Sequence, residues 1–173
     1  MSLADRMTDL PTFLAYSVAL EEEAADRHDE LADMMDVHNN PEVAATFRKL
    51  AHYSRLHAQE IRDHARAQEL PNIAPWEYGW EDMEGPETAD VAQVDYLINT
   101  RRALAVAMGN EKRAHDFYAD IGRHAPAPDV RELAAAFAAE EQEHLALLEA
   151  WQARLPESED DSPYDPDPPH MPE

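Results

Sequence analysis

The chain has 173 residues, enough for one domain with a buried core, and it contains no cysteine. The lack of cysteine excludes disulfides, zinc–thiolate sites, iron–sulfur clusters and thiol catalysis. A net charge of −23, from 37 acidic and 14 basic residues, argues against nucleic acid and anionic membranes as partners.

Two helical segments open the chain. The first runs from about Pro11 to Val37, and Asp9 before it suits an N-cap. The second begins at Asn40-Pro41, a cap residue followed by proline at the first helical position, and continues to about Gln68. Inward positions in this second segment recur at alternating steps of three and four, which is the period of a helix with one buried face.

Two more helices follow. The third is expected to start near Thr88 or Asp90 and to continue to about Arg123. The fourth follows Pro126 and Pro128 and ends near Leu155, with the same three-and-four spacing of inward residues. No segment shows the alternation of a strand. The predicted class is therefore all-α.

The lengths of the connections predict the topology. The connections at residues 38–40 and 124–127 are so short that the two helices each of them joins must form an antiparallel hairpin. Some twenty residues, 70–89, separate the hairpins, and at roughly 3.3 Å per residue they can return along helices about 40 Å long. A short, a long and a short connection in this order are typical of a ferritin-like four-helix bundle, in which two antiparallel hairpins are joined by a long crossover. We place this bundle in residues 1–155.

The crossover and the C-terminal end have distinct compositions. The aromatic side chains of residues 75–80 are expected to pack the crossover onto the bundle. Residues 156–173 are acidic and rich in proline, which predicts a disordered or extended tail. The longest apolar stretch, residues 133–139, is too short to span a membrane, and the first residues lack the apolar region of a secretory signal. We expect a cytoplasmic protein.

The two hairpins are copies of one another. An offset of 90 residues pairs Glu21 with Glu111 and His28 with Tyr118, and an offset of 87 pairs His57 with His144. Each copy brings acids or histidines to positions that should be apolar. Such side chains are costly to bury unless a metal or another partner compensates them, so the repeat predicts a metal site inside the bundle.

Di-iron and di-manganese bundles use one Glu from each of two helices and a Glu-x-x-His from each of the other two. Residues three apart lie on the same helix face, so both side chains of a Glu-x-x-His pair converge on one point. The residues of this chain that match are Glu21, His57, Glu111, Glu141 and His144. A single buried Glu or His is more often part of an ion pair, but five that follow an internal repeat favour metal binding.

Two positions needed a choice. Glu21 is followed by Glu22 and Glu23, and only Glu21 aligns with an acidic residue in the second copy of the repeat. Glu21 is therefore assigned as the ligand, and Glu22 is the alternative. On the second helix Ser54 occupies the place of the glutamate that should precede His57. A serine hydroxyl is a poor ligand, and Glu60 lies one turn out of register. Four further histidines, each considered singly, are expected at the surface or its edge: His28, His52, His64 and His115.

With these motifs the chain resembles the rubrerythrin-like branch of the ferritin-like superfamily over residues 11–154. The resemblance rests on LEEEAADRH and LAHYSRLH in the first hairpin and on NEKRAHDFY and FAAEEQEH in the second. It implies two non-haem irons per chain, held by the five residues named above, that react with hydrogen peroxide or dioxygen. Manganese or zinc are the alternatives to iron.

The chain departs from that family at three points. Ser54 leaves one metal short of a carboxylate, Ala114 replaces a further glutamate on the third helix, and there is no cysteine for a rubredoxin module. A peroxidase of this kind would need an external electron donor. The expected function is a di-iron oxidoreductase that reduces peroxide or oxidises ferrous iron. The alternatives are an iron-binding or storage protein without a dedicated substrate, and a scaffold that has lost one metal. A homodimer is expected.

Overall fold

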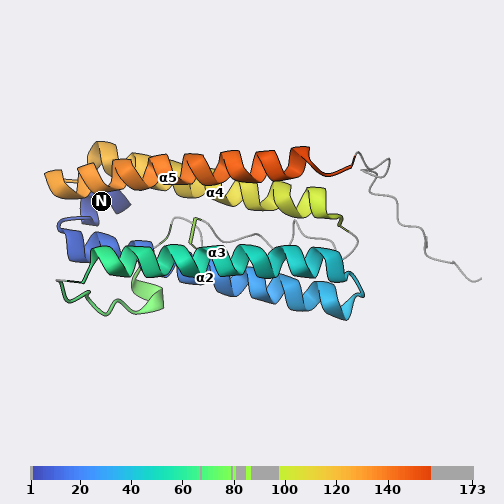
Figure 1. The fold of residues 1–173 in the computed structure, drawn as a ribbon. Helices are drawn as coiled ribbons and strands as arrows, with labels where there is room; N and C mark the ends of the chain where they lie inside the picture. Colours follow the sequence, from blue (N-terminus) through green and yellow to red (C-terminus); the bar gives the residue numbers. More distant parts are fainter. Residues whose placement is uncertain (1, 67, 79, 81–84, 87–97, 157–173) are drawn as a thin grey trace, which may run out of the picture.

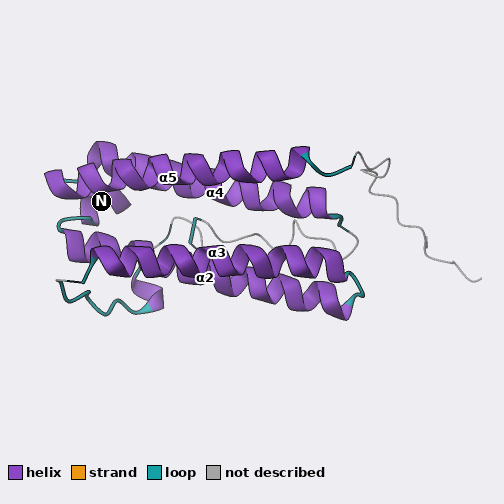
Figure 2. Ribbon diagram, viewed as in Figure 1, coloured by secondary structure: helices purple, strands orange, loops and turns teal. Residues whose placement is uncertain are grey.

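The structure is a computed structural model that describes residues 2–66, 68–78, 80, 85–86 and 98–156. Every regular element in the described part is helical (Figure 2). Four long helices form the bundle, and a four-residue helix and a single 3₁₀ turn accompany them. In chain order the elements are α1 Leu3–Arg6, α2 Leu10–Val37, α3 Pro41–His64, η1 Pro75–Glu77, α4 Thr100–His124 and α5 Pro128–Ala153.

The helices pair as two antiparallel hairpins, as the loop lengths predicted. α2 and α3 lie together along one side of the bundle, and α4 and α5 lie along the other (Figure 1). α3 ends at the end of the bundle where α2 begins, whereas α4 begins at the opposite end, so the chain crosses the length of the bundle between them. The ferritin-like arrangement is confirmed.

Local sequence accounts for the first hairpin. Asp9 caps α2 by accepting a hydrogen bond from the Thr12 N–H at 2.9 Å, as predicted. The turn between the helices puts Asn39 at φ 57°, a conformation that asparagine tolerates better than most residues. Asn40 was expected to cap α3 with its side chain. Its amide Nδ2 instead donates to the Ile98 carbonyl at 2.8 Å and so ties the turn to the chain just before α4.

Charged pairs follow the outer seam of this hairpin. Three arginines of α3 are spaced seven residues apart, so they return to the same face of the helix every two turns. Each of them pairs with acidic side chains of α2: Arg48 with Asp33 and Asp36, Arg55 with Asp26 and Asp29, and Arg62 with Glu22. Exposed pairs of this kind contribute little to stability, about 0–1 kcal/mol each, but they favour this register of the two helices.

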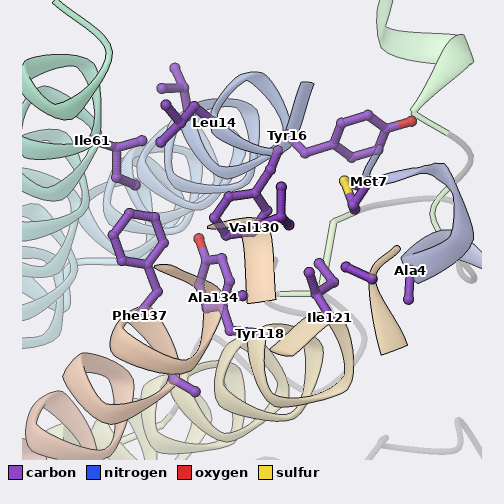
Figure 3. Packing of buried hydrophobic residues seen from close by; sticks show 14 of the residues in the cluster. Ala4, Met7, Leu14, Tyr16, Ile61, Tyr118, Ile121, Val130, Ala134 and Phe137 are labelled. Carbon is purple, nitrogen blue, oxygen red and sulfur yellow. The ribbon is translucent and has the colours of Figure 1, made fainter. Parts of the chain in front are cut away.

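Two apolar clusters fill the bundle, one toward each end. The first includes Phe13, Ile61, Tyr118 and Phe137. Figure 3 shows Ile61 of α3 and Phe137 of α5 facing one another between the hairpins. The second cluster, toward the other end, includes Leu31, Phe47, Leu50, Leu104 and Leu148. The acids and histidines of the internal repeat lie between the two clusters in sequence order along every helix.

The crossover is attached by its aromatic residues only in part. Tyr78 and Trp80 pack against Tyr16, with ring centroids 4.9 and 5.5 Å away, so the predicted packing holds for these two. Trp80 also donates its indole N–H to Glu23 at 3.3 Å. Trp76 is 84% exposed, and the expectation that it packs on the bundle is wrong.

Some predicted boundaries need correction. The start of α4 was expected near Thr88 or Asp90, which lie outside the described residues. Ile98 and Asn99 are not helical, and the Asn99 side chain accepts from the Arg102 N–H at 2.9 Å as the N-cap, so α4 begins at Thr100. α3 ends at His64, four residues earlier than predicted. The predicted tail falls almost wholly outside the described residues. Within the described part, no helix is both long and apolar enough to cross a membrane.

Candidate metal centre

Each hairpin contributes at least one glutamate and one histidine to the middle of the bundle. Glu21 of α2 is 1% exposed and Glu141 of α5 is 4% exposed, which are low values for carboxylates. His57 of α3 and His144 of α5 meet across the hairpins, with parallel rings whose centroids are 4.0 Å apart. The four residues therefore come from three helices and both copies of the repeat.

The second hairpin holds its donors most tightly together. His144 Nδ1 lies 3.0 Å from Glu141 Oε2 and 3.5 Å from Glu111 Oε2. One ligand atom from each of these three residues lies within 4.8 Å of the others, the spacing of groups that can share a metal ion. Glu141 and His144 are one helical turn apart on α5, which is why the Glu-x-x-His motif places them together.

The first hairpin is looser. Glu21 Oε2 is 3.8 Å from His57 Nδ1, beyond hydrogen-bonding distance, and this oxygen is buried without a hydrogen-bond partner in the described part of the chain. Ser54, one turn before His57, is buried but brings no carboxylate. A buried carboxylate oxygen without a partner is costly, and a bound cation would remove that cost.

The three neighbouring glutamates of α2 have separate roles. Glu21 points into the bundle, Glu22 is exposed and pairs with Arg62, and Glu23 accepts hydrogen bonds from Trp80 and from the Gly85 N–H at 2.9 Å. The position of Glu21 is the one that the repeat selected. Glu60 is exposed, one turn beyond His57, on the side of the centre away from Ser54.

Burial and mutual repulsion dominate the electrostatics of the centre. Burial, reinforced by the charge of Glu111, raises the pKa of Glu21 well above its usual value. Burial likewise raises the pKa of Glu141 to about 8. Burial disfavours a charged His144, but its contacts with Glu111 and Glu141 outweigh this effect and raise its pKa to about 10. Burial and the neighbouring His144 lower the pKa of His57.

These shifts describe a site that keeps protons when no metal is present. Near neutral pH, Glu141 carries a proton and His144 is charged, although both are positioned as ligands. Burial also opposes ionisation of Glu111, yet its contacts with His144 and Glu141 hold its pKa below the usual range. A divalent cation would replace the protons and balance the crowded carboxylates. Carboxylate oxygens with imidazole nitrogens suit iron, manganese or zinc, so the residues present fit the metal that the motifs imply.

Two cavities reach the centre from opposite ends. One, of about 380 Å³, is lined by Glu21, Glu141 and Tyr118 among others. The other, of about 680 Å³, is lined by Glu111, Ser54 and His28 among others. The stacked imidazoles of His57 and His144 border both cavities.

One residue near the centre was missed by the sequence analysis. His28 was expected at the surface or its edge, but it is 4% exposed. Burial lowers the pKa of His28 to about 4. The pairing of His28 with buried Tyr118 in the internal repeat was the signal that could have placed it inside. His52 and His64 are exposed and His115 is partly exposed, as expected.

Comparisons with known proteins agree with the fold and the motifs. The family model described as Rubrerythrin matches residues 12–151. A solved structure of an uncharacterised conserved protein from Magnetospirillum magnetotacticum MS-1 is 40% identical, with a TM-score of 0.63; the alignment covers 87% of this chain and 97% of that one. No curated protein matches the chain. The match of the family model across most of the sequence shows that the chain belongs to the rubrerythrin family.

Proposed function

We propose that this protein binds non-haem iron between its two hairpins and uses it to reduce peroxide or to oxidise ferrous iron. The observation that carries the proposal is the convergence of five buried or half-buried donors at one level of the bundle. They are Glu21, His57, Glu111, Glu141 and His144. Bound iron would supply the one-electron and two-electron chemistry that these side chains lack.

The chain's own residues would bind the metal, keep water away and admit a small oxidant. The apolar clusters on either side of the centre, with Phe137 and Leu148 nearest the motif of α5, limit the access of solvent. The cavity of about 380 Å³ leads to Glu21 and Glu141 and has room for peroxide or dioxygen. Its rim carries Glu60 and Glu140, which favour an uncharged oxidant or a metal cation over an anion.

Repeated turnover needs electrons from another molecule. The chain contains no cysteine and so offers no iron–sulfur centre and no thiol of its own. We therefore assign the reductant to a separate donor. Without it, the expected reaction is a single oxidation of the bound ferrous iron.

The proposal can be tested with two neighbouring variants. Glu21→Ala removes a buried donor. Glu22→Ala removes the next residue of the same helix, an exposed acid that pairs with Arg62. Each protein is loaded anaerobically with ferrous iron, freed of excess metal, and mixed with hydrogen peroxide in a stopped-flow spectrometer. The Glu22→Ala protein should form ferric iron as fast as the unmodified protein. Glu21→Ala should be slower by at least about tenfold, because loss of a ligand costs at least as much as loss of its supporting contacts.

The same experiment separates the alternatives. If the unmodified protein binds iron but oxidises it no faster than ferrous iron is oxidised in buffer, the result would indicate a binding or storage protein. Equal rates for Glu21→Ala and Glu22→Ala would contradict the proposed site.

A further inference from the structure

His28 is a buried imidazole with no visible structural purpose. Its side chain lies on α2 two turns beyond Glu21 and is 4% exposed. Neither ring nitrogen has a hydrogen-bond partner among the described residues. Its nearest ring is Phe47, with centroids 6.1 Å apart, which contributes packing only. Buried polar groups are normally hydrogen-bonded, and an exception calls for a water, an ion or another ligand at that place.

The ring lies in the half of the centre that is short of a carboxylate. His28, Ser54, His57 and Glu111 line the same cavity of about 680 Å³. Ser54 stands where the repeat has Glu141, and its hydroxyl is a poor ligand for iron. An imidazole, by contrast, is among the common ligands of iron, zinc and copper.

The two copies of the internal repeat differ at two positions on the walls of the two cavities. In one half of the centre Tyr118 and Glu141 line the cavity of about 380 Å³. The corresponding pair in the other half is His28 and Ser54. One half therefore has a phenol and a carboxylate, and the other has an imidazole and a hydroxyl. The copy that has no carboxylate at Ser54 carries a metal-binding imidazole, His28, on the wall of the same cavity.

We propose that His28 is a metal ligand that replaces the carboxylate missing at Ser54. It would act with Glu111 and His57 once their side chains close around the ion, because among the described residues only Glu111, Glu141 and His144 already have ligand atoms within 4.8 Å of one another. The centre would then bind two metal ions without a fourth glutamate. This inference rests on the metal centre proposed above. The other acids that could fill the gap are placed elsewhere: Glu60 lines the opposite cavity, and Glu22 is exposed and paired with Arg62.

Metal stoichiometry tests this directly. Co²⁺ serves as the probe, with binding followed by equilibrium dialysis and by the visible absorption of the bound ion. The unmodified protein should bind two equivalents. His28→Phe should bind one, and the double variant His28→Phe with Ser54→Glu should regain the second, because the carboxylate then occupies the place that Glu141 has in the other half. His115→Ala, which changes a histidine on the outer face of α4, should bind two.

A second readout separates a ligand from a structural histidine. Phenylalanine keeps a flat ring and needs no hydrogen bonds, and the cavity of about 680 Å³ beside it has room for the larger ring. The metal-free His28→Phe protein should therefore melt at the same temperature as the unmodified protein or higher. A variant that binds one ion and yet is at least as stable when metal-free has lost a ligand. A metal-free variant that melts at a lower temperature would mean that His28 supports the fold, and the inference would be wrong.

The remaining outcomes are also decisive. Two equivalents in His28→Phe, bound as tightly as in the unmodified protein, would overturn the role of His28 and leave the metal centre intact. A second equivalent that stays lost in the double variant would likewise contradict the exchange of ligands. No Co²⁺ bound by the unmodified protein would overturn the metal centre itself.

Discussion

Glu141 and His144 form the most complete part of the proposed centre. They share one turn of α5, with 3.0 Å between His144 Nδ1 and Glu141 Oε2, and Glu111 lies beside them. Replacing either with alanine should therefore abolish high-affinity metal binding. His115→Ala should leave it unchanged, because His115 pairs with Asp116 at the edge of α4. Iron content after anaerobic loading and desalting measures the effect, and equal losses in all three proteins would place the site on another face.

The shifted pKa values of this pair make the stability of the metal-free protein depend on pH. The pKa of Glu141 is raised by burial to about 8, and that of His144 is raised to about 10 despite burial by its contacts with Glu111 and Glu141. Between pH 7 and 8 the folded protein thus holds protons that the unfolded chain has released. The free energy of unfolding should fall as pH rises through this window, by about 1–2 kcal/mol.

Urea unfolding of the metal-free protein at pH 7 and at pH 8 tests this dependence. Glu141→Gln keeps the shape of the protonated acid and cannot ionise, so it should weaken the dependence. Metal-loaded protein should lack it, because the ion has already displaced these protons. Stability that rises from pH 7 to pH 8 in the metal-free protein would contradict the assigned protonation states.

For single residues of the site, the sequence predicted the position where the same residue type recurs in both copies of the repeat, and it did not where the types differ. Glu21 could be chosen over Glu22 because only Glu21 aligns with an acid in the second copy. His28 aligns with Tyr118, a different residue type, so the repeat did not mark it as a ligand, and it was expected at the surface or its edge. The ring of His28 packs on Phe47 of another helix, and its nitrogens have no hydrogen-bond partner in the described part of the chain; periodicity within one helix reports neither feature.

Among the elements, the crossover offers a sharp contrast between two tryptophans. Trp80 stacks against Tyr78, packs edge-on against Tyr16 and Phe117, and donates to Glu23. Trp76 is 84% exposed. Trp80→Ala should lower the free energy of unfolding by about 2–4 kcal/mol, somewhat less than a fully buried aromatic would cost. Trp76→Ala should change it by less than about 0.5 kcal/mol.

Thermal unfolding of the two tryptophan variants in the metal-free state provides the comparison. A similar loss for both would show that the crossover is held by Trp76 as well. No loss for Trp80→Ala would show that the contacts of Trp80 with α2 and α4 do not stabilise the bundle.

The ends of the elements were harder to predict than their existence. The three-and-four spacing of inward residues identified α3 and α5, whose buried residues recur along most of their length. It did not fix the start of α4, since Thr88, Asp90 and Asn99 are all competent caps and the structure uses Asn99. The short helix α1 has only four residues, too few for a period, and its capping by Ser2 depends on the Asp5 carboxylate and backbone.

For the whole molecule, we predict a homodimer. Three large apolar side chains are exposed on α3 and α5: Tyr53 and Leu56 of α3 at 43% and 45%, and Leu147 of α5 at 68%. Exposed apolar groups that gather on one face often mark a contact with another protein. Light scattering at micromolar concentration should give a mass of twice the 19.6 kDa of one chain. The double variant Leu56→Glu with Leu147→Glu should have the mass of a single chain. A mass of one chain for the unmodified protein would contradict the prediction.

The central claim is that metal binds in the interior of the bundle, between the two hairpins. Crystals of protein loaded anaerobically with ferrous iron, measured at the iron absorption edge, test it most directly. We predict strong anomalous peaks between α2–α3 and α4–α5, one of them within bonding distance of donor atoms of Glu141 and His144. Iron found only at the acidic surface, or an interior without any anomalous peak, would contradict the account.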